Sequence, residues 1–396
     1  MQSRRDMSTA TVWFAALCAT ALALTACADA PNAPSALDAA SSSAAANAPA
    51  LDRRNGDSNG PGAVYTLTNA AGGNAVVAFH RAENGALTPL GSFATGGNGT
   101  GGTLDPLTSQ YAVVVNATHE ALFAVDAGSD DITSFRIAPD GALTRVSQVS
   151  SRGTLPNSIA VHGNLVYVLN SGDNTVSGFR VGGGAQLIAL PHTTRALAPG
   201  ANGAAAIRFT PDGRRLIVAE RVSNRLEVFP VRENGRLGDP VVSPGNGSAS
   251  FGFDITALNQ PIVSETQGSV TSYALASNNT LSPITASIST GGNAPCWVTI
   301  TADGRFAYAT NSASATLAGF AVDAGGHLTS ITPNAQSGAG AVPIDLDHVG
   351  NRFIYTLEAG TGTIGTFSIN ADGTLAAHAD VPAGAPASGM QGLAAF

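Results

Sequence analysis

The chain has 396 residues, of which 44% are hydrophobic and 12% are charged, which is enough apolar material for a sizeable core. Its net charge of -8 gives no electrostatic basis for binding a phosphate backbone, so we expect no nucleic-acid partner. The 19 basic residues are all arginines, which excludes lysine chemistry such as Schiff-base formation or a P-loop.

Residues 1–27 are typical of an export signal, because two arginines precede an apolar stretch at 12–24 that is too short for a permanent membrane helix. The stretch ends in Leu24-Thr25-Ala26-Cys27, which resembles a bacterial lipobox, a signal in which the cysteine becomes the lipidated first residue. Ordinary cleavage at residues 26–28 is the alternative. We therefore expect an exported bacterial envelope protein that contacts the membrane only through a lipid on Cys27. The outer membrane facing the periplasm, or the cell surface, is the expected place.

Residues 28–61 are rich in Ala, Ser, Pro and Asn, so we expect a flexible tether in front of a folded domain at 62–396. Residues 56–60 match the G-x-S-x-G elbow of serine hydrolases but lack the strand-to-helix context that this elbow needs. Residues 97–102 match G-x-G-x-x-G, yet Leu-Asp-Pro follows where a dinucleotide site needs a helix. We predict a loop there and no cofactor.

From residue 62 onward, a unit of four short β-like runs recurs seven times. The second run ends in a polar residue, the third run holds an aromatic residue, and a turn followed by Leu precedes the fourth run. The polar residues are Asn69, Asp126, Asn170, Glu220, Glu265, Asn311 and Glu358, and the aromatic residues are Phe79, Phe135, Phe179, Phe229, Tyr273, Phe320 and Phe367. Successive aromatic residues are 44 to 56 positions apart. This pattern predicts an all-β fold, a seven-bladed β-propeller of four-stranded antiparallel blades.

The first unit begins at Ala63-Val64-Tyr65, which corresponds to the second run of the repeat. The missing first strand is available at the other end of the chain, in residues 391–396. We therefore predict that the C-terminal strand joins the first blade and closes the ring, which leaves no open edge.

Because strands alternate in direction, the polar ends of the second runs meet the starts of the first runs on one face of the disc, around the channel. The expected ligand face comprises Asp126, Asn170, Glu265, Asn311, Glu358, the pair Cys296-Trp297, and His192 and Arg195 from the long connection at 191–203. The carboxylates could attract a cation at the channel mouth; alternatively, each polar end caps its own turn. The seven histidines lack the spacing of metal ligands, so we predict no metal centre.

The segments PDGRRLIVAE, ADGRFAYATN and GNLVYVLN, each followed by V-x-x-F and G-x-L or a close variant, resemble the seven-bladed propeller lactonases, the family of 6-phosphogluconolactonase and carboxymuconate lactonising enzyme. The resemblance covers residues 63–396 and implies this fold and lactone hydrolysis. The family's Arg-His pair falls on Ala205 and Ala206, and its Asn-Glu pair falls on Glu220 and Arg221. A further family histidine falls near position 157 or 158. The usual catalytic set is therefore not reproduced, and Glu220 with Arg221 is the candidate for a displaced one.

We expect a monomeric propeller that binds a small molecule or an envelope protein on its channel face without the family's usual catalytic residues. The alternative is a carboxylic ester hydrolase that opens a lactone with a site rearranged around Glu220, because lactone hydrolysis needs a general base and a donor for the oxyanion.

Overall fold

The computed structural model describes residues 60–396. The export signal, Cys27 and nearly all of the expected tether lie outside the described residues. Within the described part, no helix is long and apolar enough to cross a membrane.

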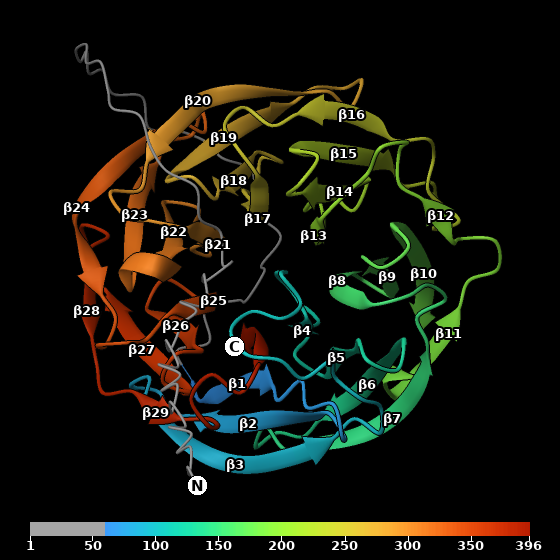
Figure 1. The fold of residues 1–396 in the computed structure, drawn as a ribbon, viewed down its shortest axis with the longest axis horizontal. Coiled ribbons are helices and arrows are strands. Elements are labelled where there is room, and N and C mark those ends of the chain that lie inside the picture. The colour runs from blue at the N-terminus through green and yellow to red at the C-terminus, as the bar shows by residue number, and fades with distance from the viewer. Residues whose placement is uncertain (1–59) are drawn as a thin grey trace, which may run out of the picture.

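Seven antiparallel sheets surround a central channel, which confirms the predicted seven-bladed propeller (Figure 1). Blade 1 holds β1 (Gly62–Leu67), β2 (Ala75–Arg81), β3 (Leu87–Ala94) and β30 (Gln391–Ala395), and blade 2 holds β4 (Val113–Val115), β5 (Ala121–Asp126), β6 (Asp131–Ile137) and β7 (Leu143–Ser150). Blade 3 holds β8 (Pro156–His162), β9 (Leu165–Asn170), β10 (Thr175–Val181), η1 (Gly183–Ala185), β11 (Leu187–Ala189) and β12 (Arg195–Ala196). Blade 4 holds β13 (Ala204–Phe209), β14 (Arg215–Glu220), β15 (Arg225–Pro230) and β16 (Val241–Pro244).

In blade 1 the order from the channel outward is β30, β1, β2 and β3, and in the other blades it follows the chain. Blade 5 holds β17 (Ser250–Ile255), β18 (Pro261–Glu265), β19 (Ser269–Leu275) and β20 (Leu281–Ser289). Blade 6 holds β21 (Pro295–Ile300), β22 (Phe306–Asn311), η2 (Ser312–Ser314), β23 (Thr316–Val322) and β24 (Leu328–Gln336). Blade 7 holds β25 (Pro343–Val349), β26 (Phe353–Glu358), β27 (Thr363–Ile369), β28 (Leu375–Ala377) and β29 (Val381–Pro382).

The ring closes as predicted, because the C-terminal strand β30 pairs antiparallel with β1. The carbonyl oxygen of Phe396 accepts hydrogen bonds from the backbone nitrogen of Ala63 at 3.1 Å and from Nε of Arg81 at 2.8 Å. Arg81 also donates to the carbonyl oxygen of Gly60 at 2.9 Å. One buried arginine therefore ties both ends of the described chain together.

Burial explains the composition of the strands. Second strands such as β5 are buried at every residue, because blades pack against both of their faces. Outer strands such as β7 are mostly exposed, and partly buried residues alternate with exposed ones only in the second half of β7, as expected for strands with one face in water. The seven aromatic markers of the repeat are all buried between blades.

A recurring tyrosine joins neighbouring blades. In four blades, a tyrosine near the middle of the second strand donates its hydroxyl to a glycine carbonyl in the outer turn of the next blade, at 2.8 Å in each case. The pairs are Tyr65 with Gly141, Tyr167 with Gly235, Tyr308 with Gly373, and Tyr355 with Gly85. These glycines have φ between 81° and 89°, a backbone conformation that favours glycine. The turn glycine of the repeat therefore serves two purposes, since it shapes a hairpin and presents a carbonyl to the preceding blade.

Candidate functional site

The two faces of the disc differ in what the strands bring to them. Pairs such as Ala204 with Glu220, Ser250 with Glu265 and Pro343 with Glu358 show that innermost strands begin where second strands end. We call this side the proximal face, and we call the side where the innermost strands end the distal face. The candidate residues at the strand ends therefore all belong to the proximal face.

The polar ends of the second strands are buried and bonded within the rim of the ring. In five blades, the side chain meets a hydroxyl near the start of the third strand: Asp126 meets Thr133, Asn170 meets Thr175, Glu265 meets Thr271, Asn311 meets Thr316, and Glu358 meets Thr363. The hairpin between the second and third strands is thus braced by a side-chain hydrogen bond in each of these blades. The structure places these five residues in separate blades, each with its own donors.

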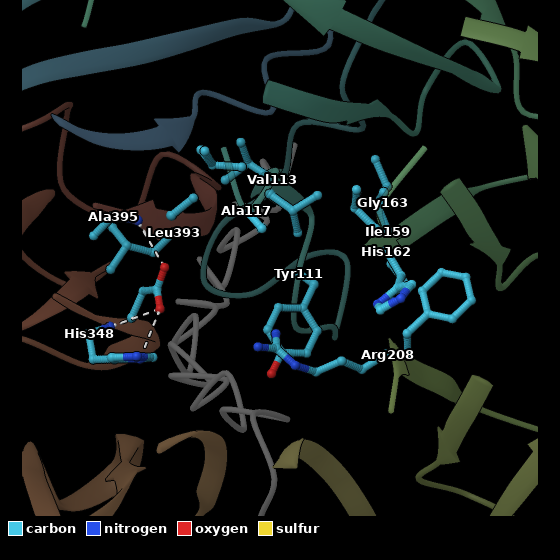
Figure 2. Close-up of a pocket in the computed structure, with 17 residues that line it drawn as sticks. Tyr111, Val113, Ala117, Ile159, His162, Gly163, Arg208, His348, Leu393 and Ala395 are labelled. Atoms are coloured by element: carbon cyan, nitrogen blue, oxygen red, sulfur yellow. Dashed lines mark hydrogen bonds and ion pairs between the residues drawn. The ribbon is translucent and has the colours of Figure 1, made fainter. Parts of the chain in front are cut away.

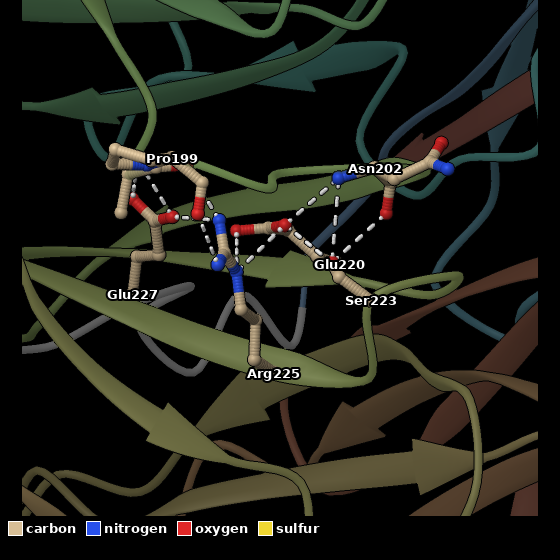
Figure 3. Close-up of polar contacts among 7 residues, drawn as sticks. Pro199, Asn202, Glu220, Ser223, Arg225 and Glu227 are labelled. Atoms are coloured by element: carbon tan, nitrogen blue, oxygen red, sulfur yellow. Dashed lines mark hydrogen bonds and ion pairs between the residues drawn. The ribbon is translucent and has the colours of Figure 1, made fainter.

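Glu220 belongs to a buried charge network in blade 4 (Figure 3). Nε of Arg225 lies 3.0 Å from both carboxylate oxygens of Glu220, and the same guanidinium donates to Glu227 at 2.9 Å. Glu220 also accepts from the Ser223 hydroxyl and from the backbone nitrogen of Asn202. Burial and the neighbouring Glu220 carboxylate raise the pKa of Glu227 to about 7. The acceptor sites of Glu220 are therefore occupied by the protein's own donors.

Two further carboxylates have raised pKa values because they are buried. Burial, and then the charge of Asp380, raise the pKa of Glu358 to about 7. Burial also raises the pKa of Asp126, although Thr95, Thr133 and Asn74 donate to it. These shifts follow from desolvation inside the blades and do not require a ligand.

Cys296 and Trp297 are both buried at the start of β21. The indole of Trp297 packs edge-on against Phe251, with ring centroids 5.2 Å apart, and its nitrogen donates to the carbonyl oxygen of Ser109 at 2.8 Å. His192 and Arg195 lie at the outer edge of the ring, where β12 pairs with β10. Arg195 forms an ion pair with Asp239 at 2.6 Å there, so the structure does not bring this pair to the channel.

A segment that the repeat did not predict crosses the channel at the proximal face. Residues 103–112, between β3 and β4, run through the centre of the ring (Figure 1), and we call them the plug segment. Hydrogen bonds connect it to five innermost strands: Leu107 to Gln391 of β30, Gln110 to Ser158 of β8, Gln110 to Ala205 of β13, Tyr111 to Phe253 of β17, and Gln110 to Val298 of β21.

The plug segment occupies the position at which the family resemblance places a catalytic pair. The backbone nitrogen of Gln110 donates to the carbonyl oxygen of Ala205 at 3.0 Å, and its side-chain amide donates to Val298 at 2.7 Å. Gln110 itself is fully buried. Beside it, burial raises the pKa of Asp105 to about 8, against the opposing effects of a hydrogen bond to Gln391 and the charge of Arg221. Arg221 thus faces the plug segment from the edge of blade 4.

The distal half of the channel contains a pocket of about 340 Å³ (Figure 2). Five innermost strands line it, namely β4, β8, β13, β25 and β30. Valine, isoleucine, leucine and alanine side chains form most of its wall, and its polar groups come from Tyr111, His162, Arg208, Asp347 and His348. A mainly apolar wall with a few convergent polar groups is typical of a small-molecule site.

Sequence reasoning did not single out the polar residues of this pocket for a ligand. Arg208, Asp254 and Asp347 each stand one or two residues before the end of an innermost strand. Aligning the first runs of the repeat would have shown this coincidence, because a charged residue in a buried innermost strand is rare. Among residues 60–396, no cluster of three or more His, Cys, Asp or Glu side chains could hold a metal ion.

Comparisons with known proteins agree with this architecture. A family model described as a seven-bladed β-propeller lactonase matches residues 72–280 and 255–391. A 6-phosphogluconolactonase of Yersinia pestis is 26% identical over 207 residues, which are 50% of this chain and 62% of the relative. The chain thus matches less than two thirds of that relative's length.

Solved structures of low sequence identity share the fold. A Bacteroides fragilis protein has a TM-score of 0.69 at 17% identity, with 86% of this chain and 99% of the other covered. The periplasmic gluconolactonase of Pseudomonas aeruginosa has a TM-score of 0.65 at 19% identity, with 84% and 98% covered.

Proposed function

Because the chain belongs to the lactonase family of seven-bladed β-propellers, we propose that it binds a small molecule in its channel and does not open lactones at the proximal face. The observation that carries this proposal is the plug segment, whose Gln110 is hydrogen-bonded to Ala205 where the resemblance places a catalytic Arg-His pair. Gln110, Ala205 and Ala206 are all fully buried, so a substrate carbonyl cannot reach this position in this conformation.

The state of Glu220 supports the same proposal. A general base must reach the proton that it removes, at about 2.6–3.2 Å or through one water. The Glu220 carboxylate is instead fully buried and receives donors from Arg225, Ser223 and Asn202. Binding at the distal pocket requires none of these groups.

Lactone hydrolysis is the second candidate function, because the matched Yersinia pestis relative is named a 6-phosphogluconolactonase. If the protein hydrolyses lactones, Glu220 and Arg221 would form a rearranged catalytic pair after the plug segment moves.

A hydrolysis assay separates the two functions. The purified protein is given a panel of sugar and muconate lactones, with the Yersinia pestis relative as the positive control and Glu220→Gln as the matched variant. We expect no turnover above the uncatalysed rate. Turnover that the Glu220→Gln variant loses while keeping its melting temperature would replace the binding function with the rearranged hydrolase.

We further propose that Cys27 carries a lipid that holds the protein in the bacterial envelope. The Leu-Thr-Ala-Cys sequence at 24–27 supports this proposal. Cell fractionation tests it, since the wild-type protein should partition with membranes and Cys27→Ala should be soluble after export. Equal membrane partitioning of the two proteins would contradict lipidation.

A further inference from the structure

Arg208 is held in a defined position at the wall of the distal pocket. Its Nε lies 2.9 Å from Oδ1 of Asp254, and its guanidinium carbon lies 4.6 Å from the centroid of the Tyr111 ring. The Tyr111 hydroxyl donates to the carbonyl oxygen of Phe253 at 2.6 Å, which fixes the ring beneath the guanidinium. Figure 2 shows this guanidinium beside Tyr111 in the middle of the channel.

Asp254 anchors Arg208 without covering it. The Asp254 carboxylate also accepts the backbone N–H groups of Ile255 and Ile300, at 2.7 and 3.1 Å, and is only 6% exposed. Arg208 is 26% exposed, and its contact with Asp254 is made through Nε. A guanidinium has five N–H donors, so terminal donors are available to a group in the pocket.

The facing wall carries a fixed acceptor. Oδ2 of Asp347 accepts from the backbone nitrogen of Ala395 at 2.9 Å, and its Oδ1 accepts from the backbone nitrogen of His348 at 2.8 Å. The Asp347 side chain nevertheless remains 27% exposed. It lines the same pocket as Arg208. Burial lowers the pKa of that arginine, but the charge of Asp254, and to a smaller extent that of Asp347, more than offset this and raise it.

A donor-rich group and an acceptor therefore face one apolar-walled cavity. We propose that the distal pocket binds a small monocarboxylate that carries hydroxyl groups, with the carboxylate on Arg208 and a hydroxyl donating to Asp347. This inference rests on the proposed binding function and names its site and ligand class.

The charges of the pocket argue against a phosphorylated ligand. The positive charge of Arg208 faces the carboxylates of Asp254 and Asp347, so every negative charge on a ligand adds repulsion. A monocarboxylate adds one charge, which charge-assisted hydrogen bonds to Arg208 offset, whereas a phosphorylated ligand adds at least one more. The volume of about 340 Å³ is at the lower end of the range for small-molecule sites, about 300–1,000 Å³.

Isothermal titration calorimetry with the purified chain tests the proposal. Gluconate is the probe, and glucose, hexanoate and 6-phosphogluconate are its controls, which lack the carboxylate, lack the hydroxyls, and add a phosphate, respectively. We expect gluconate to bind and each control to bind at least about tenfold more weakly, since glucose and hexanoate each lack a hydrogen bond to a charged group and 6-phosphogluconate adds a repelled charge. The absence of binding heat with gluconate at up to about 10 mM would overturn the proposal, because any dissociation constant would then be weaker than millimolar. Equal binding of a control would overturn it as well.

Variants place the binding at this pocket. Arg208→Gln combined with Asp254→Asn removes the pair without leaving one charge buried, and Val161→Phe fills the cavity without altering either residue. We expect both to weaken gluconate binding by about tenfold or more, and Asp347→Asn to weaken it less. Glu220→Gln, at the proximal face, should bind gluconate as the wild type does.

The outcomes remain distinguishable from those of the hydrolysis assay. Unchanged gluconate binding in both the double variant and the Val161→Phe variant would overturn the distal site while leaving the absence of turnover intact. Conversely, turnover that depends on Glu220 would overturn the proposed function, while loss of gluconate binding in the two distal variants would still support the pocket.

Discussion

At the scale of single residues, the buried network around Arg225 shows how Glu220, a candidate catalytic carboxylate in the sequence, is held by an ion pair and hydrogen bonds in the structure. Arg225 lies between Glu220 and Glu227, within 3.0 Å of each, and is itself 14% exposed. Two buried carboxylates share this single guanidinium. Burial and the neighbouring Glu220 carboxylate raise the pKa of Glu227, and the charge of Arg225 opposes that rise. The positive charge of Arg225 offsets the repulsion between the two carboxylates, which would otherwise act inside the blade.

Replacing Arg225 with Met should therefore destabilise the domain by about 3–5 kcal/mol, the usual cost of leaving a buried charge without its partner. Because the folded-state pKa of Glu227 is raised to about 7, its contribution to stability is fully present below pH 4.5 and is lost as the pH rises through 7. Removing the cation raises that pKa further, so the loss should be larger at about pH 8 than at about pH 5.5. Urea unfolding of the wild type and the variant at both pH values measures this loss in the free energy of unfolding.

Arg232→Met is the matched control, because Arg232 is exposed in the adjacent turn and should change stability by less than about 0.5 kcal/mol. An Arg225 variant as stable as this control at the higher pH would show that the network contributes nothing to folding.

At the scale of elements, the C-terminal strand closes the ring by pairing with the first blade. β30 pairs with β1, and the carbonyl oxygen of Phe396 sits where a side chain on Gly62 would begin. A Cβ added to Gly62 would clash with that oxygen, a backbone atom that can move only if the strand moves.

We therefore expect Gly62→Ala to lower the free energy of unfolding by about 1–3 kcal/mol, as other overpacking changes do. Gly60→Ala is the control, since a Cβ there meets nothing within 4 Å. Removal of residues 391–396 should destabilise the domain more than either substitution. Thermal melting compares the three, and a Gly62 variant that melts with the Gly60 control would contradict closure through this contact.

At the scale of the whole molecule, the sequence predicted the number of blades and the closing strand because these follow from repetition. The polar strand end, the aromatic residue and the turn followed by Leu repeat in phase through the chain, and such a repeat can be recognised without a structure. The plug segment could not be predicted in the same way. Asp105, Thr108 and Tyr111 have φ of 45°, 48° and 69°, conformations that no local pattern of these residue types indicates. Only the long spacing between Phe79 and Phe135 pointed to extra chain there.

The candidate site was harder to predict for a related reason. The sequence placed Glu265 and Glu358 at strand ends, but the direction of each carboxylate depends on hydroxyls such as Thr271 and Thr363 in the following strand. Those partners are identifiable only once the register is known. Arg208 is one charged residue in an apolar strand, and its position depends on Asp254 of blade 5 and Tyr111 of the plug segment, which contact it.

The tyrosine bridges between blades have a mechanical consequence. They link blades 6, 7, 1 and 2 into one arc and join blade 3 to blade 4. At the equivalent positions, blades 2, 4 and 5 carry Phe123, Ile217 and Ile262, which have no hydroxyl to give. The two ends of the described chain meet in blade 1. Blade 1 therefore lies within the arc of blades that these tyrosine hydrogen bonds connect without a break. Blade 5, on the far side of the ring (Figure 1), has no such tyrosine hydrogen bond to either neighbouring blade. We therefore expect neighbouring blades to separate most readily there.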